Sequence, residues 1–244
     1  MSTNDIITND NIEKYIEELS KEYKKINNNK NISRMIFVGG AAVLLNYNFR
    51  KKTDDIDASI YSSKEMLDAI KIIAEKNKLP KDWINTDFEN SPSYSEKLKD
   101  VSKFYKMYNN KLEIRLIEGE YLIAMKLTAG RKTKHDFSDI AGILMEHKNR
   151  GKEIKIKDID KAVKYLYGNW NKISKETKSL LNKMLKDGNY EKIYNENKMI
   201  EETTKNNILK FGNTDNFLER IKGNNNSDII NTLIDNKINS VSKT

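Results

Sequence analysis

The sequence predicts an α+β fold, in which a small mixed β-sheet is flanked by helices and followed by a mostly helical C-terminal region. Two observations predict it. Apolar runs short enough for strands are concentrated in the first half of the chain, and apolar residues recur at helical spacing through most of the second half. We therefore expect residues 1–150 to form the sheet-containing core and residues 151–244 to form a helical C-terminal region.

Individual elements follow from the same patterns. We expect strands at 35–38, 55–58, 101–107 and 112–117, with Asn109-Asn110 as the hairpin turn between the last two. Helical spacing predicts helices at 10–26, 63–78, from 121 onward, 136–150, 156–167, 174–186 and 189–210, and weaker ones around 217–221 and 229–238. The stretch 89–99 is polar and reads as a loop, and Trp83 should anchor the segment 79–85 onto the core.

The composition indicates a polar protein with a basic surface. Its 244 residues include 44 Lys and Arg against 36 Asp and Glu, so that the net charge is +8. The mean hydropathy is −0.76 and the isoelectric point about 9.2. An excess of positive charge favours a polyanionic partner such as RNA. An AT-rich genome would also enrich Lys, Asn and Ile, so the charge alone does not decide the partner.

The cysteine and histidine content narrows the chemistry. The sequence has no cysteine, which excludes disulfides and thiolate metal ligands and suits a reducing cytoplasm. With only His135 and His147 and no His-x-x-x-His pair, a zinc site is not expected. The N-terminus MSTNDIITND is unlike a signal peptide, and no apolar run reaches the length of a membrane span. We expect a cytoplasmic protein without a membrane partner.

A glycine pair follows the apolar run at residues 35–38. Glycine has no Cβ and accepts positive φ, so Gly39-Gly40 between a strand and a helix would let backbone N–H groups and the helix N-terminus face an anion. A glycine pair at such a turn can also be purely structural.

Two aspartates support the interpretation of this segment as a binding site. Residues i and i+2 of a strand point to one face, so Asp55 and Asp57 should project together while Ile56 and Ala58 pack inward. Two neighbouring carboxylates repel each other unless a hard cation such as Mg²⁺ or Mn²⁺ lies between them. The alternative is a solvated acidic turn that includes Asp54.

These residues resemble a known signature. Gly39-Gly40 followed by Lys51-x-Thr53-x-Asp55-Ile56-Asp57 resembles the motif of DNA polymerase beta superfamily nucleotidyltransferases. More closely, it is similar to the bacterial branch that acts as toxins of abortive-infection and toxin–antitoxin pairs, where the segment LP-x-x-W-[LI]-N at 79–85 also occurs. The resemblance implies that Gly39, Gly40, Lys51 and Thr53 hold a nucleoside triphosphate and that Asp55 and Asp57 bind magnesium.

A second motif resembles the same branch. Lys126-Leu127-x-Ala129-x-Arg131 precedes Asp136-x-x-Asp139-Ile140, and Lys126 is the only early charge in an apolar helix. The resemblance implies that Lys126 contacts the triphosphate, that Arg131 supports it and that Asp136 orients both. The alternative is a surface helix in which the two aspartates pair with lysines at 132 or 134.

Glu113 is the candidate for a third carboxylate. It lies on the polar side of the strand 112–117, and in the resembled superfamily an acidic residue on a strand after the aspartate pair helps hold the metal and acts as base. The alternative is an ordinary ion pair with Arg115.

The expected activity is transfer of a nucleoside monophosphate from an NTP to an acceptor hydroxyl, with release of pyrophosphate. The resemblance points to RNA, for example the 3′ end of tRNA, and to a cognate antitoxin as partner. A protein or small-molecule acceptor would use the same donor site. We expect the helical region at 151–244 to bind the acceptor or a partner. A different class of function also stays open, in which the fold is a catalytically inactive module that binds RNA or a protein.

Overall fold

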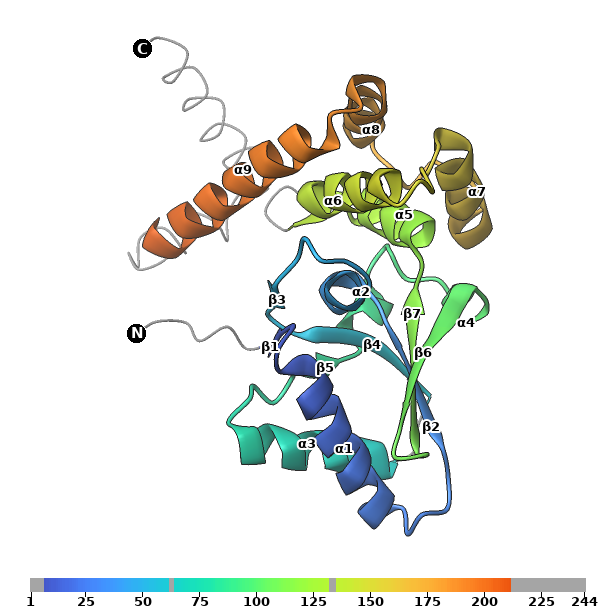
Figure 1. Ribbon diagram of the computed structural model, residues 1–244, viewed down its shortest axis with the longest axis vertical. Coiled ribbons are helices and arrows are strands. Elements are labelled where there is room, and N and C mark those ends of the chain that lie inside the picture. Colours follow the sequence, from blue (N-terminus) through green and yellow to red (C-terminus); the bar gives the residue numbers. More distant parts are fainter. Residues whose placement is uncertain (1–6, 62–63, 132–134, 212–244) are drawn as a thin grey trace. The chain divides into compact units, whose positions relative to one another are not determined.

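The computed structural model describes residues 7–61, 64–131 and 135–211 (Figure 1). The helices are α1 (Ile12–Ile26), α2 (Gly39–Asn46), α3 (Lys64–Asn77), α4 (Leu98–Val101), α5 (Gly119–Ala129), α6 (Asp136–Asn149), α7 (Ile156–Tyr167), α8 (Lys175–Asp187) and α9 (Tyr190–Phe211), with a short 3₁₀ helix η1 (Asp87–Asn90). The strands are β1 (Ile7–Thr8), β2 (Ser33–Phe37), β3 (Lys52–Thr53), β4 (Ile56–Tyr61), β5 (Ile84–Asn85), β6 (Ser102–Tyr108) and β7 (Leu112–Ile117).

The main sheet has five strands in the order β5-β4-β2-β7-β6, and β1 pairs separately with β3. Strand β2 runs parallel to β7 and antiparallel to β4, while β4 runs parallel to β5 and β6 antiparallel to β7. The sheet is therefore mixed, and the predicted α+β class is confirmed.

Each face of the sheet is covered by its own apolar cluster. Residues paired in register share a face, so Phe37, Ala58 and Leu116 lie together, and they join the cluster that contains the apolar residues of α1 and α3. On the opposite face, Ile36 and Ile117 belong to the cluster formed with α5, α6, α7 and α8. Figure 1 shows α1 and α3 side by side, apart from the group α5 to α8.

Several element boundaries have a local cause. Ser174 caps α8 by accepting a hydrogen bond from the backbone N–H of Thr177, and Gly188 ends that helix in the left-handed region. Asn109 and Asn110 also adopt positive φ, at 49° and 54°, and connect β6 to β7 as the predicted hairpin turn.

Trp83 anchors the segment after α3, as predicted. Its side chain is fully buried, and its Nε1 donates to the carbonyl oxygen of Ile70 at 3.1 Å. The ring of Tyr15 packs edge-on against it. Trp83 thus helps to hold β5 beside β4, together with the hydrogen bond from the N–H of Ile56 to the Trp83 carbonyl oxygen at 2.8 Å.

The observed elements differ from the expected ones in detail. The stretch 89–99, predicted as a loop, includes the end of η1 and the start of α4, and the strand expected from Val101 begins at Ser102 because Val101 closes α4. The weak helices predicted at 217–221 and 229–238 lie outside the described residues.

The chain divides into two compact units, Met1–Lys198 and Met199–Thr244. Helices α7 and α8, which lie beyond residue 150, contribute residues such as Ile159 and Leu181 to the same apolar cluster as α5. The assignment of residues 151–244 to acceptor or partner binding stays a prediction. None of the helices in the described part of the chain combines the length and apolar character of a membrane span.

Candidate functional site

The turn at Gly39 and Gly40 is crowded by side chains from the neighbouring elements. Gly39 begins α2 with φ of +56°, and a Cβ on it would lie 2.9 Å from Oδ2 of Asp57. A Cβ on Gly40 would lie 2.3 Å from Oγ1 of Thr53 and 2.9 Å from Nη2 of Arg50. Only glycine permits these approaches. The turn therefore faces a carboxylate, a hydroxyl and a guanidinium that come from β4, β3 and the loop before β3.

The two aspartates lie close enough to repel each other. Burial raises the pKa of Asp57 to about 6, and the negative charge of Asp55 adds to the shift. Asn85, the register partner of Asp57 on β5, donates from Nδ2 to Oδ2 of Asp55 at 3.2 Å. Ile56 is fully buried, as expected for a strand with its polar side turned to the site.

Asp87 is a further acidic residue of this region, and it belongs to neither of the two sequence motifs. It is the first residue of η1, two positions after the end of β5, and its charge also acts to raise the pKa of Asp57. Trp83 and β5 place it there, so the segment 79–85 was the signal that could have identified it. In the part of the chain that the structure describes, no group of three or more His, Cys, Asp or Glu residues is arranged to hold a metal ion.

The second motif forms a buried network of charges between α5 and α6. Nζ of Lys126 lies 2.6 Å from Oδ2 of Asp139 and 3.4 Å from Oδ1 of Asp136, and all three side chains are less than a tenth exposed. Arg131 donates its backbone N–H and its Nε to Oδ2 of Asp136, both at 3.0 Å. Burial acts to raise the pKa of Asp136, but the charge of Lys126 and the hydrogen bonds from Arg131 hold the pKa below its ordinary value.

The two motifs meet in space although about 70 positions separate them in the sequence. The positive charges of Arg131 and Lys126 act to lower the pKa of Asp57, which places both cations within electrostatic range of that carboxylate. Arg50 joins the motifs directly, since its Nη1 lies 2.5 Å from Oδ2 of Asp139. The lysines at 132 and 134, which were the alternative partners of Asp136 and Asp139, lie outside the described residues.

The structure does not bring Glu113 to the aspartates. Arg34 pairs with both Glu113 and Tyr61 in register, so Glu113 lies in the row of Tyr61, four residues along β4 from Asp57. This corresponds to about 13 Å along the strands and about 10 Å across them. Arg115 and Arg34 contact the carboxylate at 2.9 and 3.1 Å. The ion pair considered as the alternative is therefore present.

The pKa of Glu113 reflects these partners. Burial acts to raise it, but the hydrogen bonds from Arg34 and Arg115 outweigh burial, so that the pKa lies below its ordinary value. Lys51, expected to hold the triphosphate, has an exposed side chain, whereas Thr53 is buried against the glycine turn.

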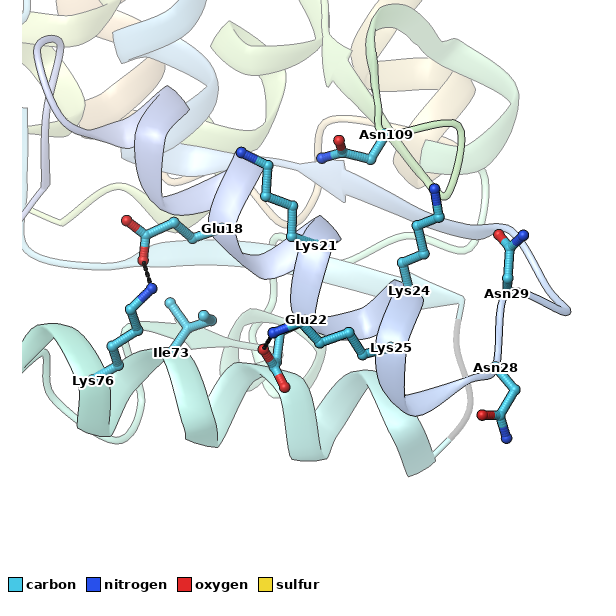
Figure 2. A pocket seen from close by; sticks show the side chains of 10 residues that line it. All are labelled: Glu18, Lys21, Glu22, Lys24, Lys25, Asn28, Asn29, Ile73, Lys76 and Asn109. Atoms are coloured by element: carbon cyan, nitrogen blue, oxygen red, sulfur yellow. Dashed lines mark hydrogen bonds and ion pairs between the residues drawn. The ribbon is translucent and has the colours of Figure 1, made fainter.

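A separate surface groove lies between α1 and α3 (Figure 2). Lys25 and Lys76 are paired with Glu22 and Glu18, and Lys21 is paired with Glu17 of the same helix. Four lysines and two glutamates line the groove, so its lining has a surplus of positive charge. It carries none of the residues of the two motifs.

Residues 14–205 match the model of a protein family described as nucleotidyltransferase of unknown function (DUF6036). The match covers more than half of the chain. The chain belongs to this family. Comparison with curated proteins and with solved structures gave no match. Both motifs of this nucleotidyltransferase family member, and the segment 79–85 that positions β5, lie inside the matched span.

Proposed function

We propose that this protein transfers a nucleoside monophosphate from an NTP to an acceptor hydroxyl and that it uses Mg²⁺ or Mn²⁺. The family supports nucleotidyl transfer in general. The observation that carries the finer proposal is the contact of Asp57 and Thr53 with the glycine turn, within electrostatic range of Lys126 and Arg131. Metal-binding carboxylates and phosphate-binding groups would then converge on one ligand.

The donor set fits a magnesium ion that arrives with a nucleotide. Mg²⁺ is commonly held by one or two carboxylates together with substrate phosphates and water, and Asp55 and Asp57 are such a pair. Burial and, after it, the negative charge of Asp55 raise the pKa of Asp57, and a divalent cation would offset both effects on the ionised carboxylate. When bound, the cation would supply positive charge to the reacting phosphate and the leaving pyrophosphate.

The residues of the chain would bind and align the triphosphate. The N–H groups of the turn at Gly39 and Gly40 and the hydroxyl of Thr53 would donate to phosphate oxygens, and Lys126 and Arg131 would neutralise charge on the leaving group. Asp136 would orient these two cations. The acceptor hydroxyl loses its proton to solvent, its oxygen bonds to the α-phosphorus, and the bond to the β-phosphate oxygen breaks. Alignment and charge account for most of the rate gain.

RNA is the acceptor that we propose, for example the 3′ end of tRNA. The net charge of +8 suits a phosphate backbone, and the resemblance to the toxin branch points the same way. On that resemblance we further propose that the protein is the toxin of a toxin–antitoxin pair and that a cognate antitoxin protein binds it. Expression in a bacterial host would then stop growth, and the Asp57→Asn variant would not.

The direct test incubates the purified protein with each labelled NTP, Mg²⁺ and total tRNA. We expect label on RNA from the wild type and a loss of at least about a hundredfold in Asp57→Asn, since a metal-binding carboxylate is removed. Asp68→Asn, an exposed change of the same type on α3, is the matched control and should transfer normally.

Two further results would change the proposal. Label on the protein itself or on a small molecule would move the acceptor away from RNA while keeping the reaction. An absence of transfer to any acceptor, with RNA or protein binding intact, would favour the inactive binding module. The Glu113→Gln variant tests the expected third carboxylate. A loss of nucleotide transfer equal to that of Asp57→Asn would show that Glu113 acts in the reaction.

A further inference from the structure

Arg50 lies over the glycine turn although no motif selected it. Its Nη2 is 2.9 Å from the position that a Cβ on Gly40 would take, beside Oγ1 of Thr53. Its side chain is 14% exposed, whereas that of the neighbouring Lys51 is exposed to solvent. The basic residue that the fold turns toward Gly40 is therefore Arg50.

Two acceptors fix the guanidinium in this position. Nε donates to the carbonyl oxygen of Lys52 at 2.9 Å, and Nη1 lies 2.5 Å from Oδ2 of Asp139. These bonds set the plane of the group and leave Nη2 as the nitrogen next to the turn. A planar guanidinium held in this way is suited to a phosphate oxygen, because little conformational entropy remains to be lost.

Asp139 couples this arginine to the second motif. The same Oδ2 atom accepts from Nζ of Lys126 at 2.6 Å, so one buried oxygen contacts a cation from each motif. The connected side chains comprise three cations, Arg50, Lys126 and Arg131, against the carboxylates of Asp136 and Asp139. Arg50 and Lys126 are buried in this group, whereas the side chain of Arg131 is 56% exposed. Because Asp55 and Asp57 lie beside the same turn, a polyanion would bind there together with Mg²⁺, with its phosphates facing the three cations and the N–H groups of the turn.

We propose that Arg50 is a phosphate-binding residue of this site and that Asp139 is the positioning residue that aims Arg50 and Lys126 at the same anion. This inference rests on the proposed function, because the anion is the triphosphate of the NTP. It gives to Arg50 the role that the resemblance gave to Lys51.

Inorganic triphosphate is the probe, since it carries the anion without a base. Calorimetric titration in Mg²⁺ compares the wild type with Arg50→Gln, Arg50→Lys, Lys51→Gln and Asp139→Asn, and Arg34→Gln, which removes a remote exposed arginine, is the matched control. We expect Arg50→Gln to bind at least about tenfold more weakly, because a charge-assisted hydrogen bond is lost. The triphosphate affinity of Arg50→Lys should lie between the affinities of the wild type and Arg50→Gln. The Lys51→Gln variant should lose less affinity than Arg50→Gln.

Asp139→Asn separates positioning from folding. It should weaken triphosphate binding and raise KM for the NTP more than it lowers kcat, with a thermal unfolding curve that stays cooperative. If Asp139→Asn unfolds, Arg50→Lys against Arg34→Gln decides the result, since Lys126 still neutralises Asp139 in both.

The results of these experiments distinguish the role proposed for Arg50 from the proposed nucleotidyl transfer. If the wild type transfers nucleotide and binds triphosphate, but Arg50→Gln behaves as Arg34→Gln or Lys51→Gln loses more, the role of Arg50 is overturned and the function stands. A wild type that binds neither triphosphate nor NTP overturns both.

Discussion

At the scale of single residues, Asp57 shows the cost of assembling this site. Its carboxylate is pressed against Gly39, is largely removed from water and faces the charges of Asp55 and Asp87. Burial, then the charge of Asp55 and, to a smaller extent, that of Asp87 raise its pKa, and Arg131 and Lys126 of the second motif compensate only in part. A side chain held with a pKa near 6 instead of 3.8 lowers the stability of the metal-free protein at neutral pH.

The first prediction is a pH-dependent gain in stability for Asp57→Asn. Because the pKa of Asp57 is higher in the folded than in the unfolded protein, the folded state loses stability as the pH rises from about 4 through 6. Because Asn does not titrate, the free energy of unfolding of the variant should exceed that of the wild type by about 2 kcal/mol at pH 8 and by little at pH 4. Thermal unfolding in EDTA at the two pH values measures it.

Magnesium provides the control for this prediction. At pH 8, Mg²⁺ should raise the unfolding temperature of the wild type and leave that of Asp57→Asn almost unchanged, because the cation needs the ionised carboxylate. An equal melting temperature for the two proteins in EDTA at both pH values would contradict the assigned burial and repulsion.

At the scale of elements, turns with positive φ determine where the strands and helices meet. The hairpin at Asn109 and Asn110 sets the register of β6 against β7, and the carbonyl oxygen of Tyr108 accepts from the N–H of Lys111 at 2.9 Å across it. Both central residues have positive φ, the combination that hairpins with the right-handed twist of strands require. The side chain of Asn110 is exposed, so its backbone conformation can be tested alone.

The second prediction concerns this turn. Asn110→Gly should be more stable than Asn110→Val by about 1–2 kcal/mol, because a β-branched residue is strained in the left-handed region. Urea unfolding measures the difference. The same pair of changes at Lys103, an exposed position inside β6, should give the opposite order, since glycine weakens a strand interior. If the Gly variant were more stable than the Val variant at both positions, or less stable at both, the turn geometry would be refuted.

At the scale of the whole molecule, the fold brings two charged sequence motifs to one place and leaves a net positive protein. The charge of +8 is spread over 44 basic and 36 acidic residues, so no single lysine decides the attraction to a polyanion.

The third prediction is a strong salt dependence of RNA binding. Basic side chains that contact phosphates release counterions, so the affinity for tRNA should fall at least about tenfold between 50 and 200 mM salt. Filter binding with Asp57→Asn, which retains the surface but not the reaction, should give the same slope. An RNA affinity that does not change with salt, or no RNA binding at all, would favour a protein or small-molecule acceptor.

The sequence by itself determined the fold class and most of the elements, and it led us to expect Asp55 and Asp57 on one side of the chain. Periodicity reports which side of an element is buried, and the spacing of Asp55 and Asp57 around Ile56 is a local property of a strand. The resemblance added the second motif. These features depend on neighbours in the chain.

Only the tertiary structure decided which side chains share the site. It moved Glu113 into a row with Arg34, brought Asp87 near Asp57, and turned Arg50 instead of Lys51 toward Gly40. Each outcome depends on strand order, register or an ion pair between residues far apart in the chain, such as Arg50 with Asp139. Sequence spacing does not report such distances, because they are set by how the sheet and the α5–α6 pair pack together.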